Sequence, residues 1–157
     1  AAIDGEGHIT LAHNKARRGY DARVVVNNTD PRFIAKISQI YTDINVRYFY
    51  SYTNRVNENR RERLAISAGG LVGVQRILLF SSEFMTCKKE QAECLLSYIS
   101  WRLQASKKTG YAKYDELDNL HEMAAETQNT LIKMRHQEFD LQRLQRTASI
   151  PLKWMKE

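Results

Sequence analysis

The stretch Ala1-Ala2-Ile3-Asp4-Gly5-Glu6-Gly7 decides how the rest of this chain is interpreted. It begins with small apolar residues that favour burial in a helix, and two carboxylates follow one residue apart. Carboxylates this close repel each other unless a cation or a proton offsets their charge. Gly5 and Gly7 allow the backbone to leave a helix sharply. We therefore expect a packed helix that delivers Asp4 and Glu6 to an exposed end, where a hard divalent cation could bind among oxygen atoms.

The charge of the chain is basic and unevenly distributed. The 157 residues carry a net charge of +6. Residues 1–105 contain 15 Lys and Arg against 10 Asp and Glu, whereas residues 106–157 contain 9 against 8. A basic segment rich in arginine favours a polyanionic partner such as a nucleic acid, although an ordinary basic surface has the same composition.

Several other classes of protein are disfavoured. No run of about 18 apolar residues occurs, so no membrane-spanning helix is expected. The first residues lack the basic and long apolar regions of a signal peptide. Cys87 and Cys94 have no zinc-site spacing and are expected to be reduced core or boundary residues. We therefore expect an intracellular protein, in a compartment that the sequence leaves open.

The apolar pattern predicts alternating helices and hairpins. Val24-Val25-Val26 and the aromatic residues 48–52 are typical of strands. Thr29 or Asp30 is expected to cap a helix that begins at Pro31. The predicted strands cover residues 8–15, 20–27, 46–53 and 63–68, and the predicted helices cover residues 31–41, 71–84 and 88–105. Residues 106–110 are expected to form a linker, followed by helical sequence over residues 114–146.

The acidic run resembles the second part of the LAGLIDADG motif of homing endonucleases, whose I-D-x-[DE]-G core stands here as Ile3-Asp4-Gly5-Glu6-Gly7. Val26-Asn27-Asn28-Thr29-Asp30 resembles the family's strand-to-helix junction, and Lys88-Lys89-Glu90-Gln91-Ala92 resembles its lysine-bearing segment. The resemblance covers residues 1–105. It implies an α+β fold of the αββαββα type, in which an antiparallel four-stranded sheet binds DNA and carries helices on its other face. Residues 106–157 would form a helical C-terminal extension.

The resemblance implies a site-specific endonuclease that hydrolyses double-stranded DNA with Mg²⁺ or another divalent cation. It makes Glu6 the metal ligand, although a solvated helix cap is the alternative for this residue. It gives Asp4 a supporting role at the end of the helix. It gives Lys88 the task of stabilising charge near the scissile phosphate. A surface lysine is the alternative for Lys88, and Lys89 could take its place.

A polar residue that orients water near the metal is also implied by the resemblance. Asn28 matches this position, and Asn27 matches it equally well. An asparagine that caps a turn by hydrogen bonding is the alternative interpretation.

The predicted sheet supplies the DNA-binding residues, because alternating strand residues point to opposite faces. The residues expected to lie in the major groove are His8, Thr10, Asn14 and Arg23. Arg17 and Arg18 at the tip of the first hairpin are expected to reach phosphates or outer base pairs. The arginines that flank the second hairpin are expected to contact the DNA backbone, and these are Arg55, Arg60, Arg61 and Arg63. In the third strand the pattern leaves open whether Tyr48, Tyr50 and Tyr52 or Arg47, Phe49, Ser51 and Thr53 face the DNA.

The number of motifs bears on assembly. One run of the I-D-x-[DE]-G type occurs, and family members with one motif are homodimers, which implies a pseudo-palindromic target. A second motif upstream of this sequence would imply a monomer instead. A host intron or intein is implied by the family alone.

Two other functions remain open. One is a non-cleaving relative, either a maturase that binds intron RNA or a DNA-binding regulator. The other is a basic α/β binding module with a chance motif. The intact Asp4, Glu6 and Lys88 favour the nuclease, because a pure binder has no physical need for paired carboxylates beside a phosphate backbone.

Overall fold

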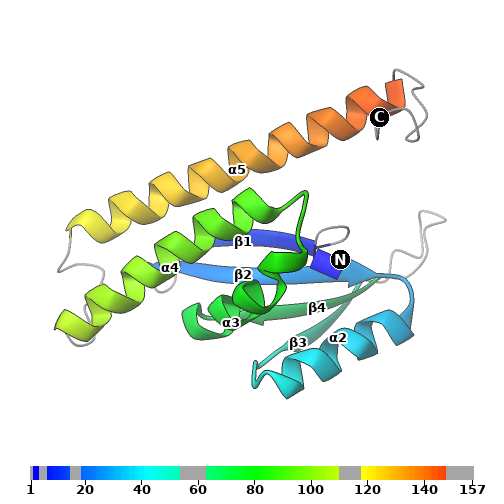
Figure 1. Ribbon diagram of the computed structural model, residues 1–157, viewed down its shortest axis with the longest axis horizontal. Coiled ribbons are helices and arrows are strands. Elements are labelled where there is room, and N and C mark those ends of the chain that lie inside the picture. Colours follow the sequence, from blue (N-terminus) through cyan, green and yellow to red (C-terminus); the bar gives the residue numbers. More distant parts are fainter. Residues whose placement is uncertain (1, 4–6, 15–18, 54–62, 110–117, 148–157) are drawn as a thin grey trace.

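The computed structural model describes residues 2–3, 7–14, 19–53, 63–109 and 118–147. Ala2 and Ile3 are helical. The elements that follow are β1 (Gly7–Asn14), β2 (Gly19–Asn28), α2 (Pro31–Asp43), β3 (Phe49–Thr53), β4 (Arg63–Gly69), α3 (Leu71–Ser81), the 3₁₀ helix η2 (Ser82–Phe84), α4 (Lys89–Thr109) and α5 (Asp118–Thr147) (Figure 1).

The strands form one antiparallel sheet in the order β1-β2-β4-β3. Helices α2 and α3 pack against β2 and β4, and α4 and α5 pack against β1 (Figure 1). The predicted α+β fold with a four-stranded antiparallel sheet is therefore confirmed.

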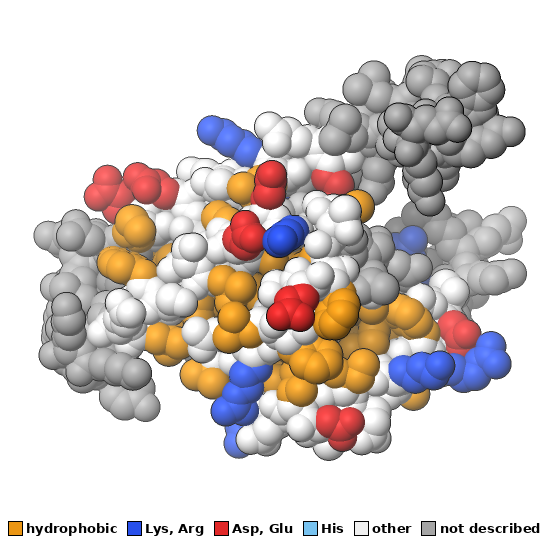
Figure 2. Space-filling view, in the orientation of Figure 1, with side chains coloured by type: hydrophobic (Ala, Val, Ile, Leu, Met, Phe, Trp, Pro, Cys, Tyr) orange, Lys and Arg blue, Asp and Glu red, His pale blue; other side chains and the backbone are white. Residues whose placement is uncertain are grey.

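The hydrophobic core lies between the sheet and these helices. Ile9, Val24 and Ile66 from three neighbouring strands are all 0% exposed, and Leu78 of α3 and Leu95 of α4 are equally buried. Burying side chains of this size contributes about 1.5–3 kcal/mol each. Figure 2 shows the helical side, where hydrophobic side chains gather over α3 and η2.

The end of α2 explains why β3 begins later than predicted. The expected strand over residues 46–53 begins at Phe49. Asn45 has a positive φ of 57° and donates its N–H to the Thr42 carbonyl oxygen (3.0 Å), while Val46 donates to the Tyr41 carbonyl oxygen (2.8 Å). These two bonds make a Schellman motif, in which the apolar residue after the left-handed residue packs against the helix end. Val46 is accordingly 5% exposed, as part of the helix cap and not of the strand.

Two other boundaries differ from the predictions. Helix α4 continues to Thr109, so most of the expected linker over residues 106–110 is helical. Lysines at positions 107 and 108 favour this extension, because cations are stabilising near a helix C-terminus. The helix expected over residues 71–84 ends at Ser81, and its last turn is the 3₁₀ helix η2.

The entry of the chain into the sheet requires a glycine at position 7. A Cβ atom built on Gly7 would lie 2.6 Å from both the Cα and the carbonyl oxygen of Ile3. Backbone atoms at this distance cannot move aside independently, so only glycine fits. Ile3 itself is buried, at 8% exposed, and belongs to the core. Ile3 and Gly7, the residues that flank the acidic run in the chain, are therefore both held in place.

We expect Gly7→Ala to destabilise the protein by about 1–3 kcal/mol, the usual cost of forcing an extra methyl group into a packed site. Gly73→Ala is the matched control, because its Cβ would meet only Val46 Cγ1 at an ordinary 3.6 Å and Gly73 lies within α3. That change is expected to stabilise by about 0.5–1 kcal/mol. Urea unfolding of both variants measures the difference, and equal stabilities would contradict the close approach.

Candidate nucleic-acid interface and catalytic centre

Strand register defines the two faces of the sheet. Residues directly opposite each other on antiparallel strands project from the same face. His8 pairs with Val25, Val25 with Ser67, and Ser67 with Phe49, so these four side chains form one row across all four strands. The adjacent row starts with Ile9, Val24 and Ala68, which are buried beneath the helices. The row of His8 therefore lies on the opposite, open face.

The register also shows which side chains of β3 lie on the open face. Phe49 and Ser51 pair with Ser67 and Ala65 on the open face, and Phe49 is 72% exposed. Tyr50 and Tyr52 pair with Ile66 and Leu64 and so project from the helical face. There the Tyr50 ring packs edge-on against Tyr48, with ring centroids 5.4 Å apart.

The predicted DNA-binding residues of the first hairpin are partly brought together. His8, Thr10 and Arg23 all lie on the open face. Thr10 is two residues from His8 and therefore projects from the same face, and Arg23 is its partner on β2. The Arg23 guanidinium is 52% exposed and lies 4.0 Å from the Asp21 carboxylate, a contact that water and salt screen. The backbone of Asn14 ends β1. The other expected contacts, Arg17, Arg18, Arg55, Arg60 and Arg61, lie outside the described residues.

Several polar residues lie at the end of the sheet where β1 begins. Gly7, which Glu6 precedes directly in the chain, pairs with Val26, so Asn27 and Asn28 lie at the same end of the sheet. Arg63 begins β4 at this end as well. Asp4 and Glu6 themselves lie outside the described residues, so their roles stay predictions.

Lys88 lies at the same end, immediately before α4. Its carbonyl oxygen accepts the first helical bond, from the Ala92 N–H (2.9 Å). Its ammonium contacts the Glu138 carboxylate of α5 (Nζ to Oε1, 3.0 Å), and the other oxygen of Glu138 accepts a hydrogen bond from Gln91 Nε2 (3.1 Å). The Lys88 side chain is only 7% exposed. The alternative of a solvated surface lysine is therefore wrong for this residue.

His8 lies within electrostatic range of this pair. Partial burial lowers the pKa of His8, and the positive charges of Arg135 and Lys88 lower it further, against a smaller opposing effect of Glu138. This lowered pKa favours the uncharged imidazole, which both donates and accepts hydrogen bonds. That suits contact with a base edge better than attraction to a phosphate.

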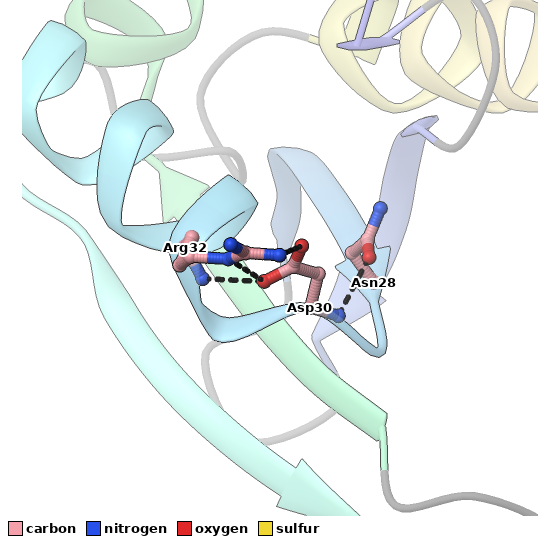
Figure 3. Close-up of polar contacts among 3 residues, drawn as sticks. All are labelled: Asn28, Asp30 and Arg32. Carbon is pink, nitrogen blue, oxygen red and sulfur yellow. Dashed lines mark hydrogen bonds and ion pairs between the residues drawn. The ribbon is translucent and has the colours of Figure 1, made fainter.

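Asn28 has a local structural task. Its Oδ1 accepts a hydrogen bond from the Asp30 N–H (2.8 Å), and Asp30 Oδ1 accepts one from the Arg32 N–H (2.9 Å) at the start of α2 (Figure 3). Asp30 is thus the N-cap, one of the two residues predicted for this position. These contacts support the interpretation of Asn28 as a turn-capping residue. Asn27 projects from the open face instead, opposite Ala65.

Comparison with solved structures identifies this arrangement. Two crystal structures of the homing endonuclease I-CvuI, each in complex with a DNA target, align over 85% of this chain and 76% of theirs with TM-scores of 0.59, at 15% and 14% sequence identity. This is the LAGLIDADG homing-endonuclease fold. The LAGLIDADG homing endonuclease I-GzeII, also in complex with a DNA target, aligns over 85% of this chain and 40% of its own, with a TM-score of 0.50 and 17% identity. No protein-family model matches the chain, and no curated protein matches it.

One candidate residue on this LAGLIDADG fold was not indicated by the sequence. Glu138 was not distinguishable from the other acids of the C-terminal region, because its partner Lys88 lies 50 residues away. Ser67 and Phe49 on the open face were recognisable only once the register was known. For Ser67 a weak signal exists, because it alternates with the apolar residues Ile66 and Ala68 of β4.

Within the described ranges no three His, Cys, Asp or Glu side chains are grouped so that they could hold a metal ion. Glu138, the carboxylate beside Lys88, is already engaged by two donors. Asp4 and Glu6, which lie outside the described residues, carry carboxylates, and carboxylate oxygens are the ligands that Mg²⁺ prefers. None of the described helices is long and apolar enough to cross a membrane.

We expect Asn28→Ala to lower the free energy of unfolding by about 1 kcal/mol, because the Asp30 N–H loses its acceptor. Asn28→Ser keeps an acceptor and is expected to cost less. Asn27→Ala on the other face of the same strand is the control, with a change below about 0.5 kcal/mol. Chemical unfolding of the three variants measures this. A full loss in Asn27→Ala with none in Asn28→Ala would contradict the turn-capping role.

Proposed function

We propose that this chain is a site-specific endonuclease that hydrolyses double-stranded DNA with a divalent cation. One observation carries the proposal: the strand that follows the acidic run is linked through α5 to a held lysine, because Arg135 donates to the Ile9 carbonyl oxygen of β1 and Glu138 contacts the Lys88 ammonium. A nuclease needs carboxylates for metal and a cation for the phosphate at the same place. The two ends of the acidic run are fixed by Ile3 and Gly7.

The open face is the proposed DNA-binding surface. A two-stranded or larger antiparallel ribbon fits the major groove, and its side chains can read base edges there. His8, Thr10 and Arg23 supply neutral and charged polar groups in adjacent rows, and Arg63 adds a cation. The hairpin-tip residues Arg17, Arg18, Arg55, Arg60 and Arg61 are proposed to contact the flanking phosphates.

In the proposed reaction a water oxygen bonds to the phosphorus, and the ester bond to the leaving sugar oxygen breaks. The divalent cation, held by Glu6 with Asp4 in support, would activate the water and neutralise charge on the phosphate. Lys88 stabilises the extra negative charge on the phosphate oxygens. The leaving oxygen takes a proton, and the phosphate stays on the other product. Asn28, or Asn27 on the open face, would orient the water.

The proposed assembly is a homodimer on a pseudo-palindromic target, so that each active site cuts one strand. The small residues Ala1 and Ala2 suit the close packing of two helices. Ala2 is partly buried against the core of its own chain. Homing of a host intron or intein belongs to the same proposal.

A non-cleaving relative is the second candidate, and one observation favours it. Glu138 already neutralises Lys88, as it would in a protein that binds without cutting. An RNA maturase and a DNA-binding regulator both belong to this class. Binding tests on duplex DNA and on structured RNA separate the two.

We expect the protein to cut one long site in a randomised duplex library with Mg²⁺ and to bind without cutting in Ca²⁺. Glu6→Gln should abolish cutting, and Lys88→Met should slow it by about 10²-fold, the usual cost of removing one group that stabilises transition-state charge. Sequencing of the cut ends measures both. Tight binding to one site with no cleavage in any divalent metal would favour the regulator or maturase.

The binding surface has a separate test in the salt dependence of affinity. Each lost phosphate contact should reduce the slope of log K against log salt by about 1. We expect this for Arg63→Ala, whereas Lys36→Ala, an exposed cation on α2 on the helical side, should leave the slope unchanged. Fluorescence anisotropy over a salt series measures the slopes. A larger effect of Lys36→Ala would place the nucleic acid on the other face.

A further inference from the structure

Helix α5 presents a charged residue at an inward position. Ala124 and Leu131 are seven residues apart on this helix, and both are buried, at 0% and 1% exposed. Residues seven apart lie on the same face of a helix, two turns away. Glu138 is the next position of this stripe. The apolar pattern predicts a hydrophobic residue at position 138, but the chain has a glutamate at this position.

Both oxygens of this carboxylate are used by neighbouring residues of one segment. Oε1 lies 3.0 Å from Lys88 Nζ, and Oε2 accepts a hydrogen bond of 3.1 Å from Gln91. The two charged side chains are 7% and 21% exposed. Gln91 is itself 4% exposed and fixes the orientation of the carboxylate that receives the lysine.

Packing alone does not explain this pair. Removing two charges from water is costly, and apolar residues of similar size at such positions are commonly as stabilising. A buried ion pair is therefore weak support for a purely structural role. The pair does restrict the conformation of the Lys88 side chain. Without a partner, a lysine ammonium on its flexible four-carbon chain populates many rotamers.

Helix α5 is also fixed against the strand that leads from the acidic run. Arg135, one turn before Glu138, donates from Nη2 to the Ile9 carbonyl oxygen at the free edge of β1 (3.4 Å). The position of the Lys88 ammonium is thus set relative to β1 through α5.

We infer that Glu138 is a positioning residue of the catalytic centre, which holds the Lys88 ammonium at one place beside the start of β1. Helix α5 then belongs to the catalytic unit and not to an accessory extension. The inference rests on the proposed nuclease function, for which Lys88 is the stabilising cation. Fixing a group in advance lowers the entropic cost of reaching the transition state and does not add binding energy for the substrate.

Three variants of the full chain test this inference. Glu138→Gln removes the charge, and Gln91→Leu is the milder change, because it loosens the carboxylate but keeps both charges. Glu126→Gln is the matched control, an exposed glutamate on the same helix. Single-turnover cleavage of the selected duplex in Mg²⁺, binding of the same duplex in Ca²⁺, and acetylation of Lys88 relative to the exposed Lys36 are measured for each.

Glu138→Gln is expected to slow cleavage by about tenfold or more while the Kd in Ca²⁺ stays within about twofold. Gln91→Leu should show a smaller loss of the same kind, and Glu126→Gln none. Acetylation of Lys88 should rise toward that of Lys36 in Glu138→Gln. Unchanged or faster cleavage in Glu138→Gln would overturn the inference, as would equal loss of binding and cleavage.

Failure of the two proposals can be told apart. A wild-type protein that binds but never cuts contradicts the nuclease function. The acetylation measurement needs no cleavage, and equal labelling of Lys88 in the wild type and in Glu138→Gln contradicts the positioning role by itself.

Discussion

The close approach of Gly7 to the backbone of Ile3 is the constraint on which the rest of the arrangement depends. The space between them admits no Cβ atom, since one would lie 2.6 Å from two backbone atoms of Ile3. Ile3 is packed into the core, and Gly7 opens the first strand. The two residues that flank the acidic run in the chain are therefore held next to each other at the end of the sheet where β1 begins.

The second organising feature is the free edge of β1. An uncovered edge strand exposes unpaired backbone groups to other chains. Here α5 packs along this edge, and Arg135 satisfies the Ile9 carbonyl group. The same helix reaches Lys88 through Glu138. Helix α5 thus covers the edge of the sheet and also holds the Lys88 ammonium in place.

Much of the fold could be predicted from the sequence. The run Val24-Val25-Val26 and the capping residues at Asp30-Pro31 indicated β2 and α2 within one or two residues. The run 46–53 was misjudged at its start, because β propensity does not distinguish an apolar residue that closes a Schellman motif from one that begins a strand. Asn45 was the available signal, since asparagine tolerates the left-handed conformation.

The candidate site was less predictable. Residues close in sequence, such as His8 and Thr10, could be assigned to one face from alternation alone. The face of β3 required its pairing with β4, and Glu138 required the packing of α5, neither of which a single sequence records. Lys88 was proposed as a site residue through the resemblance, but its burial and its partner Glu138 could not be predicted from the sequence.

The central claim is that a divalent cation binds where the acidic run enters β1. Affinity cleavage tests it most directly: Fe²⁺ replaces Mg²⁺ in the DNA-bound protein, ascorbate and peroxide generate radicals at the metal, and mass spectrometry maps the backbone cuts. The account predicts cuts near residues 4–8 and near Asn27-Asn28, which lie at the same end of the sheet, and their loss in Glu6→Gln. Cuts confined to other parts of the chain, or an unchanged pattern in that variant, would contradict it.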